Sequence, residues 1–284
     1  SSDPTNIEFE IDTVAPSVEL SHSLNRPLKN GDVDVITATI NEPLADSPVL
    51  QIAIIGADTV PLSDMTKVDS THYTYSYNAG TGNGEVSISL GAGTDVPGNL
   101  VIATPTVGAS MILDNVLPSL TVNNICDIPS NGCTTLGRNE NPQQVYMVKS
   151  LTGSSSDVGG SGVGSIKYSI KDSVTNKWYD GTFFNSSEEI MWSATGITDW
   201  SIDTSDLPLV LNNTYLVKIQ SIDLALNTQT ETLTFKFTNA PPVVSNISVS
   251  QAEESGIVTV HYDVTDIESS NTTNSLFFSI DTTL

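Results

Sequence analysis

Positive charge is the first thing that this 284-residue sequence has little of. Ten Lys and Arg residues face 33 Asp and Glu residues, so the formal net charge is -23 at neutral pH. A surface this acidic repels phosphate backbones and anionic lipid headgroups, and we therefore exclude nucleic acid as a partner. It attracts cations instead, although the same charge also keeps a protein soluble and apart from its own copies without any ligand.

Cysteine is scarce too, and the two cysteine residues lie close together in the sequence. Cys126 and Cys133 enclose the turn segment CDIPSNGC, with no neighbouring Cys or His to complete a metal site. We expect a local disulfide, with two free thiols as the alternative; a disulfide fits an extracytoplasmic protein. Four N-x-S/T sequons are compatible with that location and are candidate glycosylation sites, at Asn185, Asn212, Asn246 and Asn271.

Long apolar runs are missing as well. No stretch approaches the length of a membrane span, and no positively charged leader precedes an apolar segment. We therefore expect no membrane span in this segment, and we expect any export signal or anchor to lie outside the sequence.

Helical periodicity is nearly absent, and a period of two residues takes its place. Apolar and polar residues alternate in segments rich in Val, Ile, Thr and Tyr, at 33–40, 74–77, 85–90, 165–170, 215–222, 231–237 and 257–264. Clusters of Gly, Asn, Asp and Pro separate these segments. This pattern predicts an all-β chain of short antiparallel strands.

One short motif recurs and divides the chain into modules. DTVAPSVEL begins at Asp12, DNVLPSLTV begins at Asp114, and a degraded copy, TNAPPVVSNISV, begins at Thr238. The spacings, roughly 100 and 120 residues, match one immunoglobulin-like (Ig-like) sandwich each, the second with enlarged loops. We therefore predict the last strand of a preceding module at 1–11, module 1 at 12–113, module 2 at 114–238, and the start of an incomplete module 3 at 239–284.

The motifs that fill these modules resemble a known class of repeats. VITATINEPLADSPVLQIAI in module 1 and GSGVGSIKYSIKD with IQSIDLALNTQT in module 2 resemble bacterial and archaeal Ig-like repeats of large prokaryotic cell-surface proteins. APPVVSNISVSQ in module 3 is similar to fibronectin-like or Ig-like modules of the same proteins. The resemblance implies tandem β-sandwiches on a cell exterior that serve as stalk, adhesin or S-layer material, often with calcium; it does not supply a binding partner.

Oxygen-bearing side chains fall at equivalent places in modules 1 and 2. In an Ig-type sandwich, the segment before strand A meets the B–C and F–G loops at one end. These sources supply Asp12, Asn41, Glu42, Asp95 and Asn99 in module 1, and Asp114, Asn115, Asp157, Asp223 and Asn227 in module 2. Carboxylates and amides suit calcium, so we predict a site at each joint. The alternative is turn chemistry, in which the same side chains bind nearby backbone. Module 2 also departs from the family's D-x-A-G-N motif, with Leu226 at the glycine.

Catalytic motifs are lacking. His22, His72 and His261 fall in different modules, next to polar strand residues, and we expect solvent-facing or edge positions and no catalytic residue. All three tryptophans, Trp178, Trp192 and Trp200, lie in module 2. Exposed aromatic rings stack on sugars, which makes a glycan-binding face an alternative function, although the inter-sheet core is the simpler place for them.

The sequence thus predicts an all-β array of Ig-like sandwiches from an extracellular surface protein, structural or adhesive and stiffened by calcium. Its expected partners are the neighbouring modules, with like subunits or cell-surface glycans as further contacts. A second alternative is a self-assembling fibre, in which the strand at 1–11 completes the unfinished sandwich of another molecule.

Overall fold

The computed structural model describes residues 11–125, 143–145, 150–238, 242–251 and 257–265. Every regular element in these ranges is a β-strand, and all but one of the strand pairs are antiparallel. The chain is thus all-β and built of Ig-like sandwiches, which confirms the predicted fold class. Residues 1–10 of the predicted strand at 1–11, the predicted disulfide between Cys126 and Cys133, and the sequon at Asn271 lie outside the described residues.

Module 1 is a sandwich of two four-stranded sheets, in the orders β1-β2-β6-β5 and β4-β3-β7-β8. Its strands are β1 (Val18–His22), β2 (Val33–Ile40), β3 (Gln51–Gly56), β4 (Val60–Asp64), β5 (Thr66–Lys67), β6 (His72–Asn78), β7 (Gly84–Gly91) and β8 (Ser110–Leu113). Inward side chains alternate with outward ones along β2, where Ile36, Ala38 and Ile40 are buried. They join Ile52 and Ile54 of the facing sheet in one core.

The described residues of module 2 form a second sandwich, with seven strands in one sheet and three in the other. The large sheet has the order β10-β18-β17-β12-β13-β14, with β15 also paired to β12, and the small sheet has the order β16-β11-β9. Its strands are β9 (Ser119–Ile125), β10 (Gln143–Val145), β11 (Ser150–Ser156), β12 (Val163–Asp172), β13 (Lys177–Tyr179), β14 (Phe184–Ser186), β15 (Trp192–Ser193), β16 (Asp199–Asp203), β17 (Thr214–Asp223) and β18 (Thr228–Phe237). Its core includes Leu151, Ile166, Trp200 and Tyr215, and within the described part of the chain it is a separate cluster from the core of module 1.

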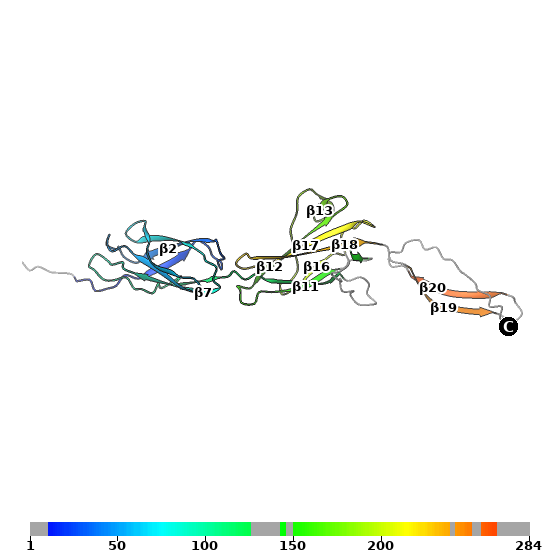
Figure 1. The fold of residues 1–284 in the computed structure, drawn as a ribbon, viewed down its shortest axis with the longest axis horizontal. Coiled ribbons are helices and arrows are strands. Elements are labelled where there is room, and N and C mark those ends of the chain that lie inside the picture. Colours follow the sequence, from blue (N-terminus) through cyan, green and yellow to red (C-terminus); the bar gives the residue numbers. More distant parts are fainter. Residues whose placement is uncertain (1–10, 126–142, 146–149, 239–241, 252–256, 266–284) are drawn as a thin grey trace, which may run out of the picture.

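Module 3 contributes an antiparallel pair, β19 (Val243–Gln251) and β20 (Val258–Thr265). All nine residues of β19 are exposed, on both faces of the pair. Figure 1 shows the two sandwiches and this pair following one another along the long axis, with the hairpin of β13 standing out from module 2. The joints between modules therefore lie at the ends of the sandwiches, where the connectors meet the loops.

Candidate metal centres

The first candidate centre lies where the connector enters module 1. Asp12 comes from the connector before β1, Glu42 from the loop after β2, and Asp95 from the loop after β7. Each offers a carboxylate oxygen, and these oxygens all lie within 4.8 Å of one another. We call these three residues the first carboxylate cluster.

Asp95 is the buried member of this cluster, and the loop that carries it is built around its carboxylate. Its Oδ1 accepts hydrogen bonds from the amides of Gly98 and Asn99, both at 2.7 Å, and its Oδ2 accepts one from the Asn99 side chain at 2.8 Å. Burial opposes ionisation of Asp95, but these bonds outweigh it and hold the pKa of the carboxyl below its usual value. Asp95 is therefore ionised at neutral pH.

The second candidate centre repeats this arrangement at the joint between modules 1 and 2. Asp114 comes from the connector, Asp157 from the loop after β11, and Asp223 from the end of β17, again with carboxylate oxygens within 4.8 Å of one another. Asp114 and Asp223 are fully or almost fully buried. We call these three residues the second carboxylate cluster. The connector and the two loops thus supply carboxylates at both joints.

Asp157 shows what this proximity does to a carboxylate. Its Oδ2 accepts a hydrogen bond from the Gly162 amide at 2.7 Å, whereas its buried Oδ1 has no hydrogen-bond partner among the described residues. Burial raises the pKa of Asp157 above its usual value. The negative charges of Asp114 and Asp223 raise it further, and the Gly162 bond offsets only part of the effect. A divalent cation between the three carboxylates would satisfy the free oxygen and remove the repulsion.

Two of the predicted asparagine ligands brace the clusters through their amide nitrogens. Asn99 Nδ2 donates to the main-chain oxygen of Asp12 at 3.2 Å as well as to Asp95. Asn227 Nδ2 donates in the same way to the main-chain oxygen of Asp114 at 2.9 Å and to Asp223 Oδ2 at 2.8 Å. Each asparagine therefore ties the connector to the loop that carries the buried aspartate.

The side chains of the other two predicted asparagine ligands, Asn41 and Asn115, make hydrogen bonds outside the clusters. Asn41 Oδ1 accepts a hydrogen bond from the Ser17 amide at 2.7 Å, so it supports the connector. Asn115 turns away from the second carboxylate cluster and binds loops of module 1 with both ends of its amide. These three hydrogen bonds fasten Asn115 to module 1 at the joint.

The loops of residues 95–99 and 223–227 share one conformation but differ at one residue. Gly98 has a φ of 105°, and Leu226, at the equivalent place in module 2, has a φ of 69°. A left-handed backbone is strained by roughly 1–2 kcal/mol for a residue with a Cβ. Leu226 therefore carries strain that glycine avoids in module 1.

Replacing Leu226 by glycine is expected to raise the Tm of module 2 by a few degrees. The relief of backbone strain exceeds the extra flexibility that glycine adds to the unfolded chain, which costs up to about 1 kcal/mol. Tryptophan fluorescence reports this transition, because all three tryptophans lie in module 2. Leu224→Gly is the matched control: Leu224 is 49% exposed, as Leu226 is, but has no positive φ, so this variant should melt lower than wild type. A lower Tm for Leu226→Gly would contradict the strain argument.

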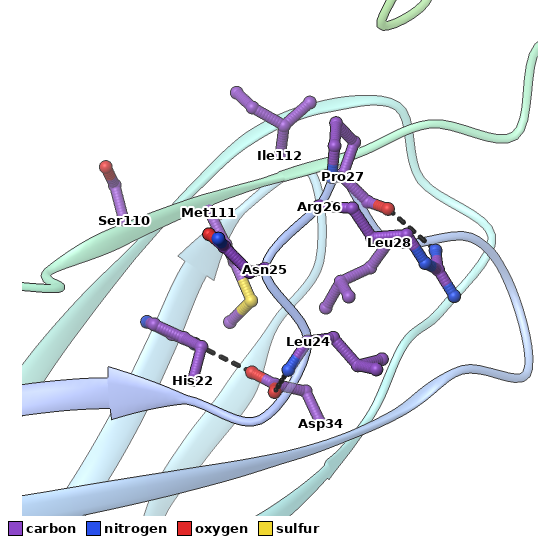
Figure 2. A pocket seen from close by; sticks show the side chains of 10 residues that line it. All are labelled: His22, Leu24, Asn25, Arg26, Pro27, Leu28, Asp34, Ser110, Met111 and Ile112. Carbon is purple, nitrogen blue, oxygen red and sulfur yellow. Dashed lines mark hydrogen bonds and ion pairs between the residues drawn. The ribbon is translucent and has the colours of Figure 1, made fainter. Parts of the chain in front are cut away.

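A surface pocket of about 280 Å³ lies beside β1 and β8 in module 1 (Figure 2). His22 lines it, with Nδ1 2.7 Å from Asp34 Oδ2 and Nε2 3.0 Å from the main-chain oxygen of Gly108. The same carboxylate also accepts bonds from Ser23 Oγ and the Leu24 amide, both at 3.0 Å. Both ring nitrogens are thus engaged by the fold. His22 sits on an edge strand, which is one of the two positions predicted for it, and its side chain is partly buried.

The three tryptophans do not share a surface. Trp200 is 2% exposed and lies in the core of module 2. Trp178 and Trp192 are half-buried in the hairpin region of β13 to β15, where Lys171 Nζ lies 5.2 Å from the centroid of the Trp178 ring. A sugar-binding face made of all three rings is therefore not present, because Trp200 is out of reach of any ligand.

The sequons that the structure describes are all accessible. Asn185, Asn212 and Asn246 are exposed, the last two with a positive φ. Asn246 Nδ2 donates to Asp263 Oδ2 at 2.6 Å, which joins β19 to β20.

Among the described residues, no helix is long and apolar enough to cross a membrane.

Comparisons with known proteins give no family. No family model matches the chain, and no curated protein does. Among solved structures, the chain is similar to the FN1–FN3 domains of chicken CNTN1, with 10% identity and a TM-score of 0.32 over 80% of this chain and 68% of that one.

Two further solved structures are similar to the chain at comparably low identity and TM-score. A tetra-tandem repeat from the extending region of a large adhesion protein shows 14% identity and a TM-score of 0.31, over 89% of this chain and 63% of that one. The three N-terminal domains of the Hoc outer capsid protein of bacteriophage RB49 show 13% identity and a TM-score of 0.32, over 90% of this chain and 71% of that one. Similarities this low leave the function to be argued from the chain's own geometry.

Proposed function

We propose that this chain is a structural and adhesive segment of a large extracellular surface protein, in which calcium stiffens the joints between Ig-like modules. The observation that carries the proposal is the repetition of one three-carboxylate cluster at two successive joints. The role is mechanical, as stalk, adhesin or S-layer material, and involves no reaction. The partners are neighbouring modules, with like subunits or cell-surface glycans as further contacts.

Calcium is the cation that these clusters suit best. It takes six to eight oxygen ligands in flexible geometry, from carboxylates, carbonyls and water, whereas magnesium demands a stricter octahedron. Each cluster combines carboxylates from the connector and from two loops, so one ion would cross-link three segments at the end of a sandwich. Asp12 and Asp114 lie in the connectors, and an ion held there would restrain the chain where it passes between modules.

A thermal melt with and without calcium tests this proposal. An ion that binds only the folded state stabilises it by about 1.4 kcal/mol at ten times its Kd and about 2.7 kcal/mol at one hundred times. Millimolar calcium, added after a chelator has been removed by dialysis, is therefore expected to raise the Tm of both modules by several degrees. Calorimetry follows both transitions, and tryptophan fluorescence follows that of module 2 alone.

Asp46→Asn is a suitable control, because Asp46 is an exposed carboxylate that belongs to neither cluster. This variant should keep the full response to calcium. A Tm that is the same in calcium and in chelator, for both modules, would remove calcium from the proposal.

A further inference from the structure

Two of the three cationic side chains of module 1 lie at its border with module 2. Arg26, in the loop between β1 and β2, donates from Nη1 to the main-chain oxygen of Ala225 at 3.2 Å. Lys29, in the same loop, donates from Nζ to the main-chain oxygen of Leu226 at 2.6 Å. Both acceptors belong to the loop between β17 and β18 of module 2. In a chain with so few cations, this concentration at one joint indicates a specific task.

The Arg26 side chain is held in place by module 1 itself. Its Nη1 also donates to Asp32 Oδ2 at 2.7 Å and to the main-chain oxygen of Pro27 at 2.8 Å. The bond to Asp32 is the main reason why the pKa of Arg26 is raised, and it lowers the pKa of Asp32 in turn. A guanidinium that is already oriented loses little conformational entropy when it meets the second module.

Asn115 makes the complementary contacts from the connector. Its Oδ1 accepts a hydrogen bond from the Asn30 amide at 2.6 Å, and its Nδ2 donates to the main-chain oxygens of Gly80 and Gly82, at 3.1 and 2.7 Å. Its own amide donates to Asn83 Oδ1 at 2.6 Å. The first residue after Asp114 is therefore fastened to two separate loops of module 1.

We propose that Arg26, Lys29 and Asn115 form a polar lock that fixes the orientation of module 1 on module 2 without any metal. Every contact of the lock joins two protein groups, and the cationic side chains bind neutral carbonyl oxygens of module 2. The lock therefore goes beyond calcium stiffening. It orients the loop that carries Asp223, and calcium would add stability to a joint whose angle is already set.

The lock is tested in the absence of calcium, with the full 284-residue chain. Residual dipolar couplings of backbone amides give one alignment tensor per module, and rigidly connected modules share a tensor. In excess chelator, modules 1 and 2 of the wild type are expected to share one tensor. The variant Arg26→Met/Lys29→Met/Asn115→Ala keeps the apolar stems of the long side chains, and it should lose the shared tensor.

Lys67→Met is the matched control, because Lys67 is the third cation of module 1 and pairs with the exposed Asp46, away from the joint. It should keep the shared tensor. The amide spectrum of each variant shows whether module 1 remains folded, and Asn115→Ala alone serves if the triple variant does not fold. Two different tensors in wild-type protein in chelator, or a shared tensor in the lock variants, would overturn the proposal. Neither result depends on whether calcium binds.

Discussion

Replacement of Trp200 by alanine is expected to lower the Tm of module 2 by more than about 10 °C, because truncation of a buried aromatic side chain costs about 3–5 kcal/mol. Trp200 lies on β16 of the small sheet, and its ring is packed over β11 at Gly153. A Cβ at residue 153 would lie 2.2 Å from Trp200 Cζ2, so even one methyl group has no room there. The alanine variant leaves a large cavity that neighbouring backbone cannot fill.

The measurement follows the fluorescence of the two remaining tryptophans, with calorimetry for module 1. Module 1 has its own core and should keep its transition temperature. Trp178→Ala is the matched control: it removes the same ring from a half-buried place, together with a contact to Lys171 worth about 0.5–1 kcal/mol. Equal losses from both variants would show that Trp200 has no special place in the core.

The same three tryptophans show which side-chain positions can be predicted from the sequence and which cannot. In DWSID the alternation puts Trp200 and Ile202 on one face of a strand, and both are buried. The sequence analysis favoured the core for all three rings, and of these Trp200 lies fully within it. Trp178 and Trp192 lie on the short strands β13 and β15, which pair with β12, and both are half-buried. Their half-burial depends on how this added region folds back on the sheet, and local alternation does not encode it.

The carboxylate clusters were predictable from the repetition of the modules. Equivalent loops of repeated modules meet the connector at the same end, so the recurrence of Asp95 and Asn99 as Asp223 and Asn227 was enough to bring these residues together. The role of Asn115 was not predictable in this way. Its partners lie some 30 to 85 residues away in module 1, and its direction follows from how two folded modules dock.

Arg26 and Lys29 were missed altogether, although one signal was available. They stand three residues apart in a loop of a chain that has only ten cations. Such a pair is a candidate for a specific contact, but the acceptors are main-chain oxygens nearly 200 residues later. Any residue offers a main-chain oxygen, so the partner of such a cation leaves no trace in the sequence.

Asp157→Asn is expected to have opposite effects in chelator and in calcium. In chelator, the variant should melt a few degrees above wild type, because it removes one of three crowded charges and keeps an oxygen for the Gly162 amide. The sign follows from the raised pKa of Asp157. The stability that the protonated carboxyl provides is fully present below its unfolded pKa and is lost as the pH rises through its folded pKa, so ionised Asp157 lowers stability at neutral pH.

In calcium, the Tm of module 2 should rise much less in Asp157→Asn than in wild type. The variant has a neutral amide in place of a carboxylate, and an amide is a weaker calcium ligand. Tryptophan fluorescence reports the transition of module 2 alone. The matching control is Glu42→Gln, which changes a carboxylate of the first carboxylate cluster in module 1. It should remove the response of module 1 and leave that of module 2. A lower Tm of Asp157→Asn in chelator would show that the three carboxylates do not repel one another. An undiminished calcium response would show that the ion does not use Asp157. The two measurements together therefore separate the charge of the cluster from its occupation by a metal.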